Sequence, residues 1–136
     1  MSTEDNKALV RRFIEEGWNQ RNSGVFDELL APDYISHTPD GDFQGLEGYK
    51  QLYNAYVTAF PDCHFTVDDL VAEGDKVSMS YTFTGTHDGQ LQDVAPTGKR
   101  VTVSGVFVGR IVGGKAVEDR TVWDTLGLMR QIGAVS

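Results

Sequence analysis

Three charged side chains near the C-terminus, Glu118, Arg120 and Asp124, have a spacing that could support acid/base chemistry. Alternate residues of an extended strand point to the same face, so the three would project together. If that face lines an apolar pocket, burial raises the pKa of one carboxyl group while Arg120 keeps the nearer carboxylate ionised. The pocket then contains one carboxyl group that donates a proton and one carboxylate that accepts a proton. The alternative is a set of exposed ion pairs, which contribute little to stability.

Two histidines are further candidates for proton transfer, because an imidazole with an unperturbed pKa of ~6.5 changes charge near neutral pH. His37 lies in an extended piece that runs into a turn, and His87 ends a strand just before Asp88-Gly89. Each could instead be a structural histidine with its hydrogen bonds satisfied. We expect the third histidine, His64, to be exposed.

Motifs of other reaction types are missing from the sequence. The histidines lack the close spacing of a zinc motif, and Cys63 is the only cysteine, so we expect neither a metal site nor a disulfide. Glycine-rich phosphate loops and a serine nucleophile elbow are absent. Cys63 and His64 would point to opposite faces of an extended segment. What remains is acid/base chemistry by carboxylates and imidazoles.

The amino-acid composition limits the kinds of molecule that the protein can bind. The 136 residues fit one domain, 1–136, and the 40% hydrophobic content is that of a folded protein. Twenty acidic residues against 12 basic ones give a net charge of −8, which disfavours nucleic acid and anionic membranes. There is no apolar run of about 20 residues and no secretory leader pattern. We expect a cytoplasmic protein that binds a small molecule.

Helices are predicted in the first half of the chain, where apolar residues recur every three or four positions over 9–20, 26–30 and 46–60. Ser2 with Asp5, or Thr3 with Asn6, supplies the first helix start. Trp18, Tyr53 and Tyr56 lie on these helical stripes. Core packing is the simpler role for them, and contact with a ligand carbonyl is the alternative.

Strands are predicted after Pro61, where the apolar period changes to two. The expected strands cover 65–71, 76–87, 100–111 and 116–124, with turns at 74–75 and 112–115. Helices followed by hairpin-connected strands indicate an α+β fold, with the helices packed on one face of a curved antiparallel sheet that closes into a cone. The irregular segment 88–98 could form the rim of a pocket.

The register of the last hairpin leaves two arrangements open. A two-residue turn at Gly113-Gly114 sets Phe107 and Val103 beside Glu118, whereas a three-residue turn groups Thr102, Ser104 and Arg110 with it. In either case Trp123 alternates away from Glu118 and is expected on the other face of the sheet or in a dimer contact.

Several motifs, in order along almost the whole chain, resemble the SnoaL-like polyketide cyclase family within the nuclear transport factor two-like fold. They include Leu30-Ala31-Pro32-Asp33-Tyr34, Phe60-Pro61-Asp62, Gly85-Thr86-His87-Asp88-Gly89, Pro96-Thr97-Gly98-Lys99 and Trp123-Asp124-Thr125-Leu126-Gly127. One departure is the polar segment 90–95, where relatives tend to be more apolar, and it bears on the mouth of the pocket.

The resemblance implies a cofactor-free enzyme that closes a ring by an intramolecular aldol reaction on an apolar or polyketide-like ligand, usually as a homodimer through the outer sheet face. It also implies that an aspartate near the end of the last strand is the general acid/base, and the matching position is Asp124. The residues predicted as catalytic are Asp124, His87 and His37, and those predicted to bind substrate are Glu118, Arg120, Trp18, Tyr53 and Tyr56. The fold also hosts ketosteroid isomerases, dehydratases, epoxide hydrolases and non-catalytic binding dimers, which remain alternatives.

Overall fold

The computed structural model describes residues 2–135, so Met1 and Ser136, the two ends of the expected domain, lie outside the described residues. The helices are α1 (Thr3–Arg12), the π-helix η1 (Phe13–Asn19), α2 (Val25–Leu29), α3 (Gly45–Ala59) and α4 (Thr125–Gln131). The strands are β1 (Leu30–Thr38), β2 (Gly41–Gln44), β3 (His64–Glu73), β4 (Lys76–Thr86), β5 (Arg100–Val112) and β6 (Lys115–Trp123).

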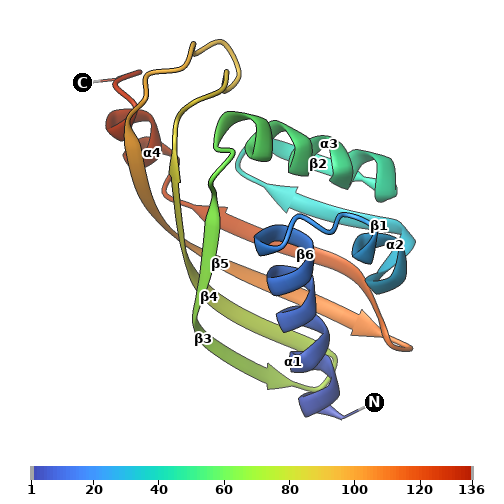
Figure 1. Ribbon diagram of the computed structural model, residues 1–136. Helices are drawn as coiled ribbons and strands as arrows, with labels where there is room; N and C mark the ends of the chain where they lie inside the picture. The colour runs from blue at the N-terminus through green and yellow to red at the C-terminus, as the bar shows by residue number, and fades with distance from the viewer. Residues whose placement is uncertain (1, 136) are drawn as a thin grey trace.

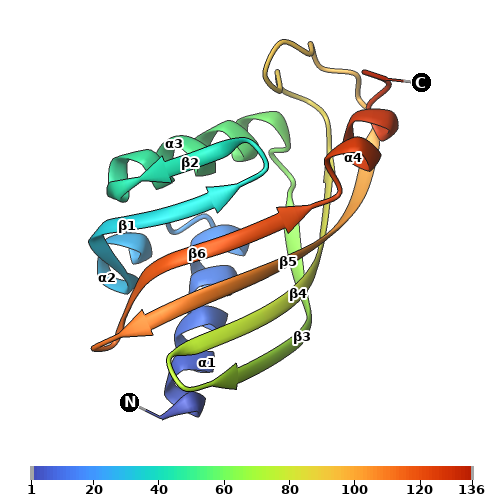
Figure 2. The same ribbon diagram turned by 180° about the vertical axis from the view of Figure 1, so that it is seen from behind.

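A single curved sheet with helices on one face confirms the predicted α+β fold (Figure 1). The strand order is β2-β1-β6-β5-β4-β3, so β2 and β3 form the two edges and the sheet stays unclosed. Neighbouring strands are antiparallel except β1 and β6, which run parallel. From behind, the strands lie in front of α1 and α3, which cover the opposite face (Figure 2).

The N-terminal helical stretch begins at the first of the two predicted starts. Asp5 N–H donates to Ser2 Oγ, and Ser2 N–H donates back to the Asp5 carboxylate, which forms a capping box. The stretch then widens into the π-helix η1, whose residues Phe13, Ile14 and Trp18 are buried against the sheet. Asn19 fixes the end of η1, since its side-chain amide exchanges two hydrogen bonds with the backbone of Phe65.

The helices and the four long strands of the second half follow the predicted pattern, whereas β1, β2 and α4 differ from it. The piece expected to be extended before the turn at Gly41 is the end of β1, which starts at Leu30 and includes Pro32. Pro32 is exposed at the start of the strand, where its missing N–H removes little pairing. α4 begins where the last strand was expected to end, because Asp124 caps it.

The core lies between the helices and the inner face of the sheet. Along β5 the odd-numbered residues from Val101 to Ile111 are buried and the even-numbered ones are exposed. Phe26, Tyr34 and Phe60 have no exposed surface. This alternation gives β5 an inner apolar face and an outer face open to solvent.

Candidate active site

A cavity of about 70 Å³ lies between the helices and the inner face of the sheet. Its walls are mostly aromatic and aliphatic, and its only acidic wall residue is Asp119. The lining residues are Phe13, Ile14, Trp18, Ser36, Tyr49, Leu52, Tyr56, Phe65, Met79, Tyr81, Phe83, Val103, Phe107, Asp119, Thr121, Trp123 and Leu128. A carboxylate in such surroundings is the feature that acid/base chemistry requires.

Asp119 is held by two hydroxyl groups from the neighbouring strand. It lies opposite Ser36 in the parallel β1–β6 pairing, so Ser36 Oγ donates to Asp119 Oδ1 at 2.8 Å. Tyr34, two residues earlier on the same face of β1, donates its hydroxyl to Asp119 Oδ2. Ser36 and Asp119 are 1% and 2% exposed. Both carboxylate oxygens therefore have a donor although the group is almost completely buried.

Burial raises the pKa of Asp119 to about 6, from an ordinary value of 3.8. Desolvation is the largest cause, and the hydrogen bonds from Tyr34 and Ser36 oppose it by stabilising the ionised form. A group that titrates near 6 can both accept and return a proton near neutral pH.

A β-bulge decides which side chains of β6 face the cavity. The Gly113-Gly114 turn has two residues and pairs Val112 with Lys115, with φ angles of 59° and 80° at the two glycines. Arg110 pairs with Glu118 and Ile111 with Ala116, which leaves Val117 as the extra residue. Since the extra residue changes the alternation, Asp119 faces inward together with Ala116.

The predicted orientation of Glu118, Arg120 and Asp124 toward the cavity is wrong. Glu118 and Arg120 share a face, as expected, but it is the outer face, where they pair with Arg110 and Val108. Asp124 is exposed, and its carboxylate accepts the Gly127 N–H at 2.8 Å as the cap of α4. The enclosed carboxylate is therefore that of Asp119. It lies between Glu118 and Arg120, the two residues that the predicted alternation placed on the inner face.

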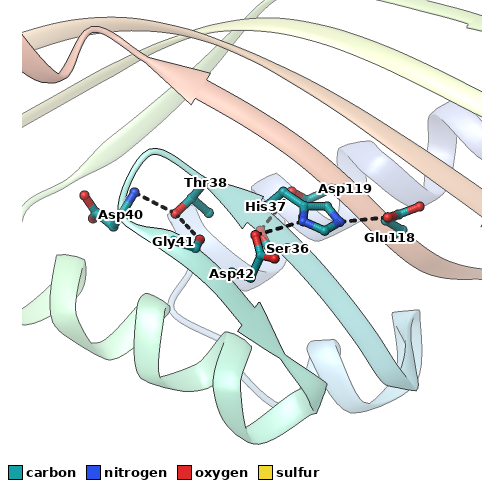
Figure 3. A network of polar contacts seen from close by, with 8 residues as sticks. All are labelled: Ser36, His37, Thr38, Asp40, Gly41, Asp42, Glu118 and Asp119. Atoms are coloured by element: carbon teal, nitrogen blue, oxygen red, sulfur yellow. Dashed lines mark hydrogen bonds and ion pairs between the residues drawn. The ribbon is translucent and has the colours of Figure 1, made fainter.

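His37 also lies on the outer face, where it bridges two carboxylates (Figure 3). Its Nε2 is 2.7 Å from Glu118 Oε2, and its Nδ1 is 2.8 Å from Asp42 Oδ1. The hydrogen bond with Glu118, followed by that with Asp42, raises the pKa of His37, and the same contact lowers the pKa of Glu118. His37 is therefore placed to form ion pairs at the surface and does not line the cavity.

His87 is completely buried, yet it lies outside the cavity lining. Its Nδ1 accepts the Thr97 backbone N–H at 3.3 Å, which leaves the proton of a neutral ring on Nε2. Nε2 has no partner among the described residues. The ring packs on Phe60, with the centroids 5.5 Å apart, beneath the irregular segment that follows β4. His64 is exposed, as expected.

Among the aromatic candidates, Trp18 and Tyr56 line the cavity and Tyr53 does not. All three are buried, with 5%, 8% and 5% of their surfaces exposed, respectively. Trp18 donates its indole N–H to the Tyr49 hydroxyl at 3.0 Å. These positions favour contact with a ligand for Trp18 and Tyr56 and core packing for Tyr53.

Asp119, Thr121 and Trp123 form an inward-facing row on β6 that the sequence analysis did not identify. The Thr121 and Tyr81 hydroxyl groups are 3.2 Å apart, and the Tyr81 ring lies over Gly105, where a Cβ atom would come within 2.3 Å of it. Trp123 has a buried indole N–H without a partner among the described residues. One sequence signal was available, because Trp123 shares the parity of Asp119 and a tryptophan is favoured in the interior.

Residues 2–135 contain no group of three or more His, Cys, Asp or Glu side chains placed to hold a metal ion. Within the same residues, no helix combines the length and the apolar character that crossing a bilayer demands.

Comparison with known proteins identifies relatives over nearly the full chain. The family described as SnoaL-like polyketide cyclase matches residues 8–132. The chain is 29% identical over 130 residues to the aklanonic acid methyl ester cyclase DnrD of Streptomyces peucetius, with 92% of this chain and 88% of that protein covered. It is 28% identical over 119 residues to the nogalonic acid methyl ester cyclase of Streptomyces nogalater, with 85% and 89% covered.

The crystal structure of AclR from Streptomyces galilaeus superposes with a TM-score of 0.88 at 30% identity and covers 99% of this chain and 100% of that one.

Proposed function

Because the chain belongs to the SnoaL-like polyketide cyclase family, we propose that it catalyses cofactor-free ring closure, or a related enolate reaction, on a small and mostly apolar ligand. Asp119 is the proton-transfer group in this proposal. The relatives from Streptomyces peucetius and Streptomyces nogalater are methyl ester cyclases, which supports the reaction type.

The single observation that carries the proposal is the setting of Asp119. A carboxylate that is 2% exposed, in a cavity lined mostly by apolar side chains, has a pKa raised to about 6. A purely structural role gives no reason to maintain an ionisable group there, because desolvation of its charge costs stability. Strained or destabilised groups of this kind are typical of functional sites.

The proposed mechanism uses the inner row of β6. Asp119 removes a proton from a carbon next to a carbonyl group, and the resulting enolate attacks a second carbonyl carbon of the same molecule. The Trp123 indole N–H and the Thr121 hydroxyl are the donors available on the same wall for the developing oxyanion. Asp119 then returns the proton to the new alkoxide. The aromatic walls hold the ligand in a folded conformation that brings the reacting atoms together.

A pair of variants tests the assignment with aklanonic acid methyl ester as the substrate. We expect Asp119→Asn to reduce the rate of ring closure by about 10²–10⁴-fold, the usual contribution of a positioned general acid/base. Asp124→Asn should retain most of the activity, because the Asn side chain can still accept the Gly127 N–H. The assignment of Asp124 from the sequence predicts the reverse order. Product is measured by chromatography, and ligand affinity is measured separately.

We further propose that the protein forms a homodimer through the outer face of the sheet, as the resemblance implied. Val106 and Val122 pair across β5 and β6, and with Val108 they are 44%, 63% and 37% exposed. An exposed apolar patch of adjacent strands is typical of a protein interface. Val122→Lys should convert a dimer into a monomer in light scattering, and a wild-type protein that is already monomeric contradicts this proposal.

A further inference from the structure

The cavity is too small for the ligand that its chemistry suits. Its volume of about 70 Å³ is below the ~150 Å³ of an apolar cavity that admits one benzene ring. Pockets for drug-sized ligands commonly have ~300 Å³ or more. A ligand with two reacting carbonyl groups therefore needs additional space beside the cavity.

The additional space lies in an open groove on the other side of α3. This outer groove is bounded by α3, the turn between β1 and β2, and residues 90–92. Leu52 and Tyr56 line both the cavity and the outer groove. These two side chains are the partition between the two spaces.

Tyr56 is held in its position by polar contacts from two other segments. Its hydroxyl donates to Asp40 Oδ2 at 2.6 Å, and Gln92 Nε2 donates to Asp40 Oδ1 at 3.4 Å. Asp40 belongs to the β1–β2 turn, and Gln92 to the irregular segment after β4. Release of the hydrogen bond to the exposed Asp40 carboxylate removes the polar restraint on the Tyr56 ring. The ring can then turn away from its neighbours Phe60 and Trp123, which opens the partition.

The chemistry of the outer groove differs from that of the cavity. Four of its lining residues carry side-chain amides, namely Gln51, Asn54, Gln90 and Gln92, and none carries a positive charge. Amides both donate and accept hydrogen bonds, which matches hydroxyl groups. Gln51 and Asn54 are one turn apart on the exposed side of α3, and their side-chain amides have no hydrogen-bond partner among the described residues. Phe43 adds an aromatic surface.

We propose that the outer groove is the second half of the ligand site and receives an uncharged, polyhydroxylated group, such as a sugar ring, attached to the flat apolar part that enters the cavity. The inference rests on the proposed ligand-binding function of the cavity. It assigns Gln51 and Asn54 to recognition of the hydroxylated group and Tyr56 to the opening between the two halves.

Two probes separate the halves. Naphthol has two rings that fit the cavity only once Tyr56 has turned and joined it to the adjoining space, and naphthyl glucoside also reaches the outer groove. The two tryptophans of the chain, Trp18 and Trp123, both line the cavity, so quenching of their fluorescence reports its occupation. We expect the wild type to bind naphthyl glucoside about tenfold more tightly than naphthol, the gain that two neutral hydrogen bonds provide. The double variant Gln51→Leu/Asn54→Leu should lose this preference and keep its affinity for naphthol.

Equal affinities of the wild type for the two probes, or an unchanged preference in the double variant, would overturn the inference while the cavity remains a ligand site. Failure of both probes to quench the tryptophans would overturn the inference together with the cavity. If the preference is found but Asp119→Asn retains full turnover, the outer groove stands and the proposed catalytic function fails.

A second measurement addresses the partition. Tyr56→Phe keeps the ring and removes the hydroxyl that bonds to Asp40, so we expect both probes to associate faster while the preference for the glucoside persists. Tyr53→Phe is the matched control, because Tyr53 is a buried tyrosine of the same helix outside the cavity lining. Equal association rates in Tyr56→Phe and wild type would remove Tyr56 from the entry route.

Discussion

Glu118 and Asp119 are consecutive acidic residues of β6 that lie on opposite faces of the sheet and differ in exposure and in pKa. Glu118, on the outer face, is partly exposed and accepts a hydrogen bond from His37, which lowers its pKa. Asp119, on the inner face, is 2% exposed, and burial raises its pKa to about 6. The face on which a carboxylate lies therefore decides whether its pKa is lowered by an ion pair or raised by burial.

The largest effect that this comparison predicts is on catalysis. Asp119→Asn should lose about 10²–10⁴-fold in turnover. Glu118→Gln, one residue away, should stay within about threefold of wild type, as expected for a surface substitution. Turnover of the test substrate by both variants, measured in parallel, is the check. Comparable losses in the two variants would mean that the two faces do not differ in function.

The next effect concerns stability and pH. The folded-state pKa of Asp119 is raised above its unfolded value, so the folded state binds more protons between pH ~4 and ~6 and loses stability as the pH rises through that window. Asp119→Asn removes this loss. We expect the variant to gain on the order of 3 kcal/mol over the wild type between pH 4 and pH 7.

Urea unfolding of both proteins across this pH range measures the gain as a difference, so the titration of other carboxylates cancels. Asn can accept from Tyr34 and donate to Ser36 Oγ, so each of the two contacts that Asp119 makes has a counterpart in the variant. A difference that stays flat with pH would show that Asp119 titrates normally.

The helices and long strands were predictable because each depends on a local period, as the agreement at α3 and β5 shows. Which carboxylate of β6 faces inward was not predictable in this way. It depends on the extra residue at Val117, and a bulge is a property of the pairing between β5 and β6 rather than of either segment alone. β1 was missed as a full strand for a similar reason, because its parallel partner lies some 80 residues later in the chain.

A finer prediction concerns the hydrogen bonds to Asp119. The Tyr34 hydroxyl stabilises the ionised carboxylate and so lowers a pKa that burial raises. Tyr34→Phe should therefore move the midpoint of the pH–rate profile upward from about 6 and reduce activity most at the acidic end, where Asp119 must be ionised to act as the base. Tyr49→Phe is the control, because the Tyr49 hydroxyl accepts from Trp18 and is not one of the two hydroxyl groups that donate to Asp119. A midpoint that does not move in Tyr34→Phe contradicts the assignment of the profile to Asp119.

The smallest expected effect is on the outer face and can be followed at His37 by NMR titration of its ring. Contact with Glu118, and then with Asp42, raises the pKa of His37 above its ordinary value of 6.5. Glu118→Gln should lower the pKa of His37 more than Asp42→Asn does.

The ion pair of His37 and Glu118 stabilises the fold between two limits, because it is lost as the pH rises through the raised pKa of His37 and as the pH falls through the lowered pKa of Glu118. Both residues are close to solvent, so added salt should weaken the shift at His37 and leave the buried Asp119 largely unaffected. A shift at His37 that is insensitive to salt would place this pair in the same dry environment as Asp119 and remove the distinction between the two faces.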